Sequence, residues 1–386
     1  MKILYTESSP NIGGQEMQAI AQMCSMRRLG HKVMLACREH SGISAAARRH
    51  DIPVVHIPFR NSLHLPSVLA LRRLIVTFRP EMVVSHSGHD SNIVGITRRT
   101  LFGGLSRFVI IRQKTYITRR MKMFSLNHMC DIVVVPSEEI RSRLINDMCR
   151  QFVVVVPPGI DFPRLRRQAR ETLPEHIDNW LKERTPAPII VQVGMIRPEK
   201  GHGFMLEVLH NLKQRGVRFY WLIVGGGRRE DEARLKAKID YLGMNDCVLM
   251  CGLMSPVAPV YGRASLMVMP SRNEAFGMAI VEATVCGVPV IASRVGGIPS
   301  VIQHGYNGIL LPPDDRVAWE NALTSFFDAP ECAQAMVRRG QKKVDVSYSI
   351  DSTVNALITL GKAERRYLSI RHGVTSGDNF YDGDGD

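Results

Sequence analysis

The sequence predicts an α/β protein built from two doubly wound domains, each with a parallel sheet. Short apolar, β-branched runs alternate with segments of helical periodicity along most of the chain, which is typical of such sheets. The chain has 386 residues, more than one ordinary hydrophobic core contains. A charged, proline-marked segment at 161–188 separates the two alternating halves, and we interpret it as the crossing between the domains.

Composition and cysteine content are those of an ordinary globular protein of the cytoplasm. Hydrophobic residues make up 45% and charged residues 22% of the sequence. The eight cysteines include no C-x-x-C pair and no set at zinc-ligand spacing, so reduced thiols are expected. Residues 1–5 indicate a short strand rather than a signal peptide, and no apolar run reaches the length of a membrane span. We therefore expect a cytoplasmic protein.

Basic charge is concentrated in the N-terminal half. Residues 1–170 contain 26 Lys and Arg against 11 Asp and Glu, whereas residues 171–386 contain 24 against 25. The first interpretation is a surface for an anionic membrane or acceptor, which would place the protein on the inner face of the cytoplasmic membrane. A solvated face is the second, and nucleic acid is third because aromatic residues make up only 6%. The charges between positions 90 and 131 are all basic: Arg98, Arg99, Arg107, Arg112, Lys114, Arg119, Arg120 and Lys122.

The first domain opens with a strand, a glycine loop, a helix and a second strand. Residues 2–6 and 31–37 are apolar runs, and residues 15–29 show helical periodicity. Gly13 and Gly14 in the first loop let backbone approach a ligand at a helix start, although a tight turn alone would also explain them. The loop is not G-x-G-x-x-G, so a dinucleotide-binding fingerprint is not supported.

Polar side chains follow the strand at 82–85, and the carboxyl ends of parallel strands are where ligands bind. His86 and Asp90 stand directly after it, and no further ligands at matching spacing complete a metal site. An acceptor-side role is favoured, with a helix N-cap as the alternative for Asp90. Arg112, at the end of a later strand, is grouped with Asp90 on the acceptor side. The other strands of this domain are expected at 54–57, 108–112, 132–135 and 153–156.

The second domain repeats the order of strand, glycine loop and helix. A strand at 189–193 runs into Gly194 and a loop that carries Arg197 and Lys200 before a helix at 204–214. Two cations beside a helix start are well placed to neutralise a diphosphate. Strands are also expected at 219–224, 248–250, 265–269 and 290–292, and helices from 296, at 336–346 and at 351–366.

Two carboxylates eight residues apart form the centre of the second domain. Glu274 lies in a loop after a strand, and Glu282 follows about one turn into a helix at 278–286. Ligands bind at such strand ends in open α/β sheets, and the free N–H groups of a helix start favour phosphate. A single acidic residue near a helix start is common for electrostatic reasons alone. The pair with Phe276 and Gly277 between its members favours a functional site.

This stretch, E-A-F-G-x-x-x-x-E, resembles the E-x7-E signature of the retaining glycosyltransferases of family 4, group 1, which have the GT-B fold. The resemblance covers roughly residues 1–368. It implies two Rossmann-like domains facing across a cleft: an acceptor-binding domain at 1–165 and a nucleotide-sugar domain at 187–349. It also implies a C-terminal helix, about 350–370, that crosses back to the N-terminal domain. Further matches are G-G-Q-E at 13–16, P-P-G-I-D at 157–161, Lys-Gly at 200–201 and Asn-Gly at 307–308.

The resemblance implies a role for each matching residue. Glu274 would hold hydroxyls of the donor sugar, and Glu282 would accept from ribose hydroxyls. Met195 stands where the family usually has Arg, which places more weight on Lys200. The implied catalytic residues are Glu274, Lys200, Arg197 and His86. The implied donor-binding residues are Gly13, Gly14, Gly194, Leu253, Phe276, Gly277, Met278 and Glu282.

The expected function is transfer of a sugar from a nucleotide-diphosphate sugar to a glycan or glycolipid, in lipopolysaccharide or other cell-surface polysaccharide biosynthesis. No metal and no other cofactor is expected, because side-chain cations and helix dipoles neutralise the leaving diphosphate. The alternatives are a nucleotide-sugar epimerase or sugar phosphorylase on the same fold, and a non-catalytic partner in glycan assembly. The acidic, glycine-rich residues 371–386 are expected to form a disordered tail rather than a calcium or D-x-D metal site.

Overall fold

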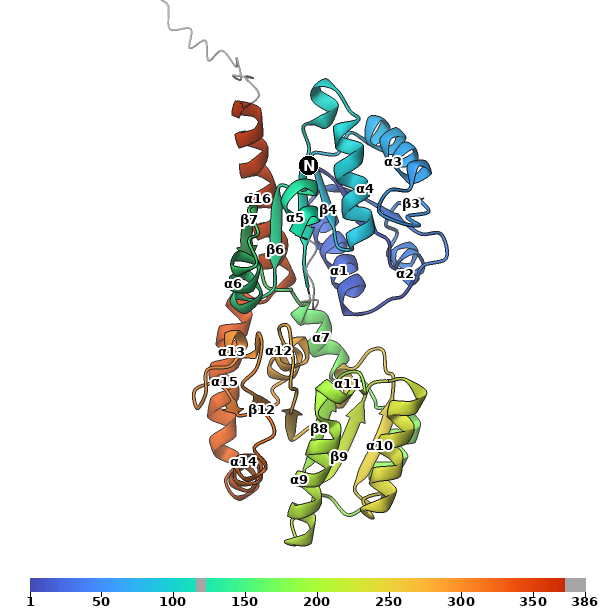
Figure 1. The fold of residues 1–386 in the computed structure, drawn as a ribbon. Helices are drawn as coiled ribbons and strands as arrows, with labels where there is room; N and C mark the ends of the chain where they lie inside the picture. The colour runs from blue at the N-terminus through green and yellow to red at the C-terminus, as the bar shows by residue number, and fades with distance from the viewer. Residues whose placement is uncertain (116–122, 372–386) are drawn as a thin grey trace, which may run out of the picture. The chain divides into compact units, whose positions relative to one another are not determined.

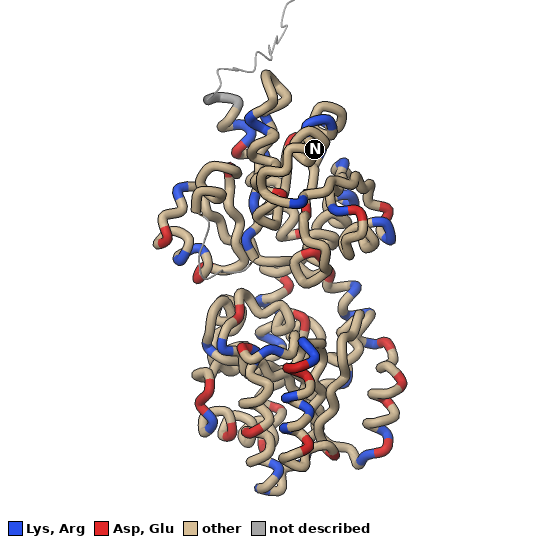
Figure 2. Tube along the Cα trace, turned by 45° about the vertical axis from the view of Figure 1, so that its right-hand side comes forward, with Lys and Arg blue, Asp and Glu red and all other residues tan. Residues whose placement is uncertain are grey.

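The computed structural model describes residues 1–115 and 123–371, in two compact units (Figure 1). The first unit contains Met1–Val135, Leu144–Val156 and the chain from Val354 onward, and the second contains Pro136–Arg143 and Pro157–Thr353. Arg119, Arg120 and Lys122, which the sequence assigns to the basic surface, lie outside the described residues, as does the predicted tail from 372 onward. Figure 2 shows Lys and Arg interspersed with Asp and Glu over the second unit.

The first unit has a seven-stranded parallel sheet in the order β3-β2-β1-β4-β5-β6-β7. Each strand is an apolar, β-branched run, as a sheet covered on both faces requires. Its strands are β1 (Lys2–Glu7), β2 (Lys32–Cys37), β3 (Val54–His56), β4 (Met82–Ser85), β5 (Val109–Gln113), β6 (Ile132–Val135) and β7 (Phe152–Val155).

Helices follow the strands of the first unit. Ile20 and Met23 of α1 and Ile43 of α2 pack with Ile3 and Tyr5 in one core. On the other side, α4 contacts β1, β4 and β5. The helices are α1 (Gly14–Arg28), α2 (Gly42–Arg49), α3 (Leu65–Phe78), α4 (Gly88–Arg99), η1 (Gly103–Ser106), α5 (Met123–Met129) and α6 (Glu138–Asn146), the first residues of α6 belonging to the second unit.

The second unit has a six-stranded parallel sheet in the order β10-β9-β8-β11-β12-β13. Successive residues of a strand face opposite sides, so Val191 lies in one core and Ile190 in the other. The strands are β8 (Ile189–Val193), β9 (Tyr220–Val224), β10 (Val248–Gly252), β11 (Leu266–Met269), β12 (Val290–Ser293) and β13 (Ile309–Leu311).

Two groups of helices cover the two faces of this sheet. The core that contains Val191 includes α8, α11, α12 and α15, and the core that contains Ile190 includes α9, α10 and α14. The helices are α7 (Phe162–Gln168), α8 (Glu175–Lys182), η2 (Pro198–Lys200), α9 (His202–Gln214), α10 (Arg229–Tyr241), α11 (Ala258–Tyr261), α12 (Met278–Val285), α13 (Ile298–Val301), α14 (Arg316–Asp328) and α15 (Pro330–Ser347).

The segment at 161–188, interpreted from sequence as a crossing, is folded into the second unit. It forms α7 and α8, and Phe162, Leu173 and Ile177 are buried in the core that contains Val191. Asp161 caps α7 by accepting from the Arg164 N–H over 3.1 Å. The N-terminal part of the first unit therefore ends at Val156, whereas the sequence-based boundary lies at 165.

The long C-terminal helix α16 (Ile350–Arg371) begins in the second unit and continues in the first. Val354, Leu357 and Ile358 are buried in the core of the first unit, together with β1 and β4. The predicted return of the last helix to the N-terminal domain is confirmed, as is the α/β class with two parallel sheets. Within residues 1–115 and 123–371, no helix is both long and apolar enough to cross a membrane.

Candidate functional site

In the second unit, two predicted catalytic side chains form an ion pair. Lys200 Nζ donates to Glu274 Oε2 over 2.5 Å, and the two side chains are 24% and 15% exposed. Lys200 ends η2, which follows β8, and Glu274 lies in the loop after β11. Because β8 and β11 are neighbours in the sheet, residues 74 positions apart meet at the carboxyl ends of two central strands.

The loop of Glu274 is fixed by backbone packing. Gly296 has φ +56°, and a Cβ at this position would lie 1.8 Å from the Glu274 carbonyl oxygen. The next residue, Gly297, donates its N–H to the same oxygen over 3.0 Å. Gly201, which follows Lys200, also approaches the chain after β11: a Cβ at Gly201 would lie 2.1 Å from the Pro270 carbonyl oxygen. Glycine is required at these contacts, and the loops hold their positions independently of the ion pair.

The start of α12 lies directly after Glu274 and has no side-chain cap. Its N-cap, Gly277, has φ +94°. Phe276 is buried edge-on against Tyr348, with ring centroids 5.4 Å apart, so its side chain anchors the loop and only its backbone is free to bind a donor. Met278, the first residue of α12, is half-buried. An uncapped helix start with its dipole favours an anion.

Glu282 lies one turn into α12 and has a partner that the sequence did not indicate. The Tyr261 hydroxyl of α11 donates to Glu282 Oε2 over 3.1 Å. Burial raises the pKa of Glu282 to about 7, and the hydrogen bond from Tyr261 opposes this rise. A hydroxyl of a ligand that donated to Glu282 would favour its ionised form.

The raised pKa of Glu282 predicts a pH dependence of stability. The Glu282 carboxyl is easier to protonate in the folded chain than in the unfolded chain. Its protonation therefore stabilises the fold fully below about pH 4.5, and this stabilisation is lost as pH rises through about 7. Glu282→Gln keeps an acceptor for Tyr261 and removes the titration. As pH rises from 5 to 8, the wild type loses this stabilisation and the variant does not. We therefore expect the free energy of unfolding of the variant, relative to wild type, to rise by on the order of 2 kcal/mol over this range. Urea unfolding of both proteins at each pH measures this, and a pH-independent difference would contradict it.

The structure does not place Arg197 with Lys200 and Glu274. Its side chain is 56% exposed and its ion-pair partner is Glu199, at 3.9 Å. It lines a separate cavity with residues of α9 and α10. Lys200 therefore lies beside Glu274 and Arg197 lines another cavity, and binding of a diphosphate by either cation stays a prediction.

The loops after β8, β9 and β10 approach one another through backbone. The Gly194 N–H donates to the Val224 carbonyl over 2.9 Å. Gly225 has φ +146°, and a Cβ there would lie 2.0 Å from the Gly194 carbonyl oxygen. Leu253, just beyond β10, is 80% exposed. The predicted donor-binding positions 194 and 253 therefore lie in loops at the same edge of the sheet.

In the first unit, carboxylates gather where β1 and β4 end. Glu7 is fully buried and accepts from the Ser87 hydroxyl over 2.8 Å. Asp90 accepts from the Thr6 hydroxyl over 2.8 Å and from the Ser8 hydroxyl over 3.3 Å. Burial, and secondly the nearby Glu7, raise the pKa of Asp90 well above its usual value, which favours its protonated form. Asp90 lies in the first turn of α4, and its N-cap is Ser87, so the alternative role as N-cap is not what the structure shows.

The buried His86 lies beside these acids. Its ring stacks on Tyr5 with centroids 5.9 Å apart. Neither ring nitrogen makes a hydrogen bond of standard geometry in the described part of the chain, although the Gln113 side chain and the Thr6 backbone lie within reach. Burial lowers the pKa of His86, while Glu7 and Glu16 oppose that shift. A neutral imidazole here offers one donor and one acceptor.

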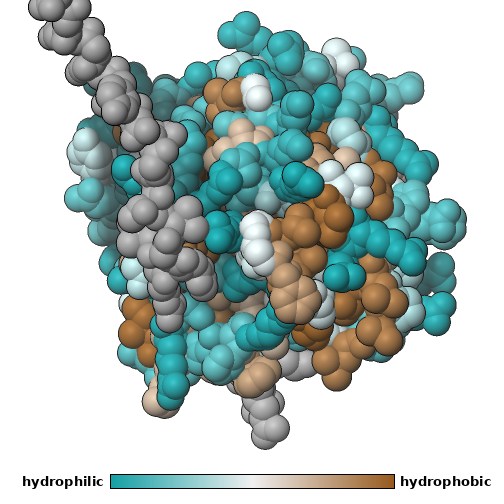
Figure 3. All heavy atoms as spheres, turned by 90° about the horizontal axis from the view of Figure 1, so that it is seen from above, coloured by the Kyte–Doolittle hydropathy of each residue, from teal (hydrophilic) through white to brown (hydrophobic). Residues whose placement is uncertain are grey.

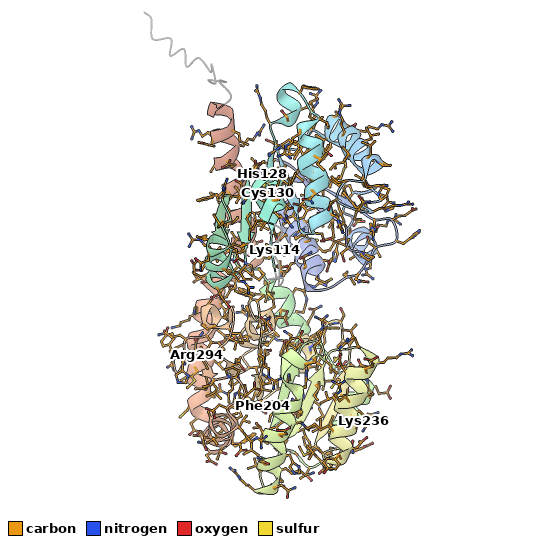
Figure 4. All side chains as sticks on the ribbon, in the orientation of Figure 1. Lys114, His128, Cys130, Phe204, Lys236 and Arg294 are labelled. Carbon is orange, nitrogen blue, oxygen red and sulfur yellow. The ribbon has the colours of Figure 1, made fainter. Side chains whose placement is uncertain are left out.

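Arg112 and Lys114 lie at the end of β5, with Lys114 labelled in Figure 4. Arg112 is buried and donates from Nη1 to the Ser125 hydroxyl over 2.7 Å. Burial, and then the Arg112 charge, lower the pKa of Lys114 to about 8. The end of β5 therefore carries two partly or fully buried cations close to the cluster around Asp90. The Arg112 charge opposes the rise in the pKa of Asp90.

The loop of Gly13 and Gly14 leaves open space at the start of α1. Gly13 is the N-cap and donates its N–H to Glu16 Oε2 over 2.7 Å. Neither glycine has a positive φ, and a Cβ at Gly14 would meet no atom within 4 Å. A tight turn is therefore not the reason for these glycines, and close approach of a ligand is the explanation that stays open.

Sequence reasoning missed several buried polar residues of these two groups. Glu7 is the last residue of β1, a strand end like the one that selected His86, and Glu16 belongs to the G-G-Q-E match. Tyr261 has no sequence signal, because it meets Glu282 through packing of α11 on α12. Among residues 1–115 and 123–371, no three His, Cys, Asp or Glu side chains are arranged to hold a metal ion.

Comparison with known families gives two matches along the chain. The model described as "Glycosyltransferase Family 4" matches residues 12–164, and the model described as "Glycosyl transferases group 1" matches residues 175–343. Curated relatives include D-inositol 3-phosphate glycosyltransferases of Mycobacterium avium, 33% identical over 233 residues, and Segniliparus rotundus, 30% identical over 222 residues. These alignments cover 57% and 56% of this chain, and the chain spans about half the length of the relatives, 51% and 48%.

Solved structures share the fold. A glycosyltransferase from Rickettsia africae superposes with a TM-score of 0.81 at 19% identity, covering 94% of this chain and 98% of the other. HepE from Anabaena, solved with UDP-glucose, gives 0.77 at 19% identity over 94% and 100%. The lipopolysaccharide outer core galactosyltransferase WaaB gives 0.65 at 15% identity over 97% and 100%.

Proposed function

Because the chain belongs to group 1 of glycosyltransferase family 4, we propose that it is a retaining glycosyltransferase using a nucleotide-diphosphate sugar. One observation carries this function: the Lys200–Glu274 pair at the uncapped start of α12. A cation and a helix N-terminus suit a leaving diphosphate, and a carboxylate held beside them suits the hydroxyls of the transferred sugar.

In this proposal the second unit binds the donor. Lys200 and the α12 N–H groups stabilise the charge that grows on the diphosphate as its bond to the sugar C1 breaks. Glu274 accepts from sugar hydroxyls, and Glu282 accepts from ribose hydroxyls. The acceptor oxygen bonds to C1 on the face that the diphosphate leaves, and its proton passes to a diphosphate oxygen. Charge neutralisation by Lys200 and α12 makes the transfer independent of a metal.

In the first unit, His86 and Asp90 are proposed to bind the acceptor. A glycan presents many hydroxyls, each a donor and an acceptor, and neither nitrogen of the buried His86 makes a hydrogen bond of standard geometry within the described chain. Gly13 and Gly14 would let backbone approach the donor. The solved relative with UDP-glucose supports a UDP-sugar as the first donor to test.

The donor proposal is tested by a thermal-shift panel of UDP, GDP, ADP and their sugars without added metal. One nucleotide should stabilise the full chain strongly, by mass action on the folded state. Glu282→Gln should weaken that response, because its ribose contact loses a charge. No response to any nucleotide, together with an unchanged melting temperature in Glu274→Ala, would instead favour a non-catalytic partner in glycan assembly. Met195, 41% exposed where the family usually has Arg, is the observation that keeps this second function in consideration.

The acceptor is proposed to be a glycolipid at an anionic membrane, in lipopolysaccharide or other cell-surface polysaccharide biosynthesis, with no role for nucleic acid. Figure 3 shows apolar side chains gathered among hydrophilic ones on one face. Leu63 and Leu65 at the start of α3 and Phe102 before η1 are 78%, 64% and 80% exposed. Exposed cations of the same unit include Arg60, Arg72, Arg73, Arg99 and Arg107. The fold shared with a lipopolysaccharide galactosyltransferase is compatible with such an acceptor.

Binding to phosphatidylglycerol vesicles tests the membrane proposal. We expect binding that weakens steeply as salt rises, because surface charges are screened. Phe102→Ser should weaken it several-fold, since an apolar ring leaves the surface. Tyr241→Ser is the matched control, an 88% exposed aromatic residue of the second unit. Absence of vesicle binding, or binding unaffected by salt, would indicate an acceptor that is not membrane-bound.

A further inference from the structure

A cavity of about 580 Å³ in the second unit lies apart from the Lys200–Glu274 pair. It is formed by η2, the first turns of α9, the α10 helix and the loops before α14 and after β11. Its charged lining contains five cations and three acids: Arg197, Arg234, Lys238, Arg272 and Arg316, with Glu207, Asp231 and Asp314. We call this cavity the α9–α10 pocket. These five cations come from four separate segments, which a single solvated helix face does not produce.

The buried side chain of His202 lines this pocket. His202 is the first residue of α9, 3% exposed, and neither ring nitrogen makes a hydrogen bond of standard geometry in the described chain. Burial, and secondly the Lys200 charge, lower the pKa of His202 to about 4, while the nearby Arg197 backbone opposes this. The Arg197 backbone can satisfy only one ring nitrogen, and a buried nitrogen without a partner is costly unless something binds it.

The start of α9 adds backbone donors to the same wall. Its N-cap is Gly201, which has no side chain to cap the first turn, and Gly203 and Phe204 also line the pocket. Figure 4 labels Phe204 on α9. Free N–H groups and the positive end of the helix dipole favour an anion at this place.

The pocket has fewer acids than cations, and the ion pairs that the acids form are partly exposed. Lys238 and Arg316 share one carboxylate, Glu207, with Lys238 Nζ 2.5 Å from it. The pair of Arg272 with Asp314 is 2.7 Å long, and both side chains are about half exposed. Exposed pairs of this kind are weak, so an anion that reaches several cations at once displaces them readily.

We propose that the α9–α10 pocket binds the phosphate group of a small phosphorylated molecule. The phosphate accepts from the α9 N–H groups and His202, and it pairs with Lys238, Arg234 and Arg316. The volume exceeds what one phosphate occupies and lies in the range of small-molecule sites, so an ester with an organic part fits better than the free ion. This site is separate from the proposed donor site and does not depend on that function.

Titration of the full chain with a hexose phosphate and with inorganic phosphate tests this site, by calorimetry and by the NMR signals of the His202 ring. We expect the hexose phosphate to bind more tightly and to shift the His202 signals. Lys238→Gln should weaken binding about tenfold, because one charge-assisted contact is lost. Lys236→Gln is the matched control: it lies on the same helix, is exposed and pairs with Asp240 rather than lining the pocket. Its effect should be less than twofold.

Four outcomes would overturn the proposal. They are an absence of binding at millimolar ligand, equal effects of Lys238→Gln and Lys236→Gln, binding without any shift of the His202 signals, and equal affinity for inorganic phosphate and the ester. Lys200→Gln separates this pocket from the proposed donor site. If Lys200→Gln abolishes binding and Lys238→Gln does not, the phosphate binds at the donor site instead. Arg234→Gln gives a second pocket variant with the same expected loss.

Discussion

Replacing Glu274 with Gln is expected to reduce kcat by about a thousandfold while the fold stays intact. In the proposed reaction the carboxylate binds sugar hydroxyls most strongly as positive charge develops at C1, so the loss falls on the transition state. The side-chain pair with Lys200 is lost, but the backbone carbonyl of Glu274 still accepts from Gly297. Steady-state kinetics with the donor found in the thermal-shift panel measures the effect, and circular dichroism checks the fold.

Glu199→Gln is the matched control for this variant. Glu199 lies in the η2 turn, is 43% exposed and faces Arg197 at 3.9 Å, so it loses the same charge at the same edge of the sheet. We expect a change in kcat of less than threefold. Turnover at the wild-type rate in Glu274→Gln would refute the assignment of the site.

Lys200→Gln is expected to lower kcat about a hundredfold, because it removes the cation nearest the proposed leaving group. It also leaves Glu274 without its partner, and this unpaired negative charge would repel the diphosphate. Arg197→Gln removes an equal charge three residues earlier, where the side chain is 56% exposed and turned to another cavity. Its effect on kcat should be at least tenfold smaller.

The comparison of these two variants decides whether η2 directs one or two cations to the diphosphate. Kinetics should be measured at saturating donor, so that kcat and the donor KM are separated. Equal losses in Lys200→Gln and Arg197→Gln would show that Arg197 turns towards the donor when it binds. Equal and small losses would remove Lys200 from the proposed mechanism.

The strands were predicted well because their signal is local. Apolar, β-branched runs bounded by turn residues give the same bounds in sequence and structure at 82–85, 132–135 and 189–193. The helices at 162–168 and 175–182 were missed because charges and prolines dominate the segment. Their signals were nevertheless present, in the Asp161 cap and in the spacing of Ile177 and Leu181.

The candidate site was predictable only as far as strand ends and loop order allow. The sequence placed Lys200 and Glu274 each in a loop after a strand, and the structure shows that these two strands are neighbours. The direction in which each side chain points could not be predicted from the sequence. The η2 turn separates the side chain of Arg197 from that of Lys200, although the two residues are only three positions apart. The pairing of Tyr261 with Glu282 depends on how two helices pack, and no local pattern encodes that contact.

The path of α16 has a consequence for synthesis on the ribosome. The core of the first unit includes Val354, Leu357 and Ile358. The other buried residues of that core lie between Ile3 and Val156, so the ribosome has synthesised them long before α16. Translation of the residues between takes about 10–40 s at about 5–20 residues per second. During that interval the sheet of the first unit exposes the apolar surface that α16 later covers. Nascent chains that stall before residue 354 should therefore recruit chaperones, whereas the second unit, which ends at Thr353, has all its strands by then.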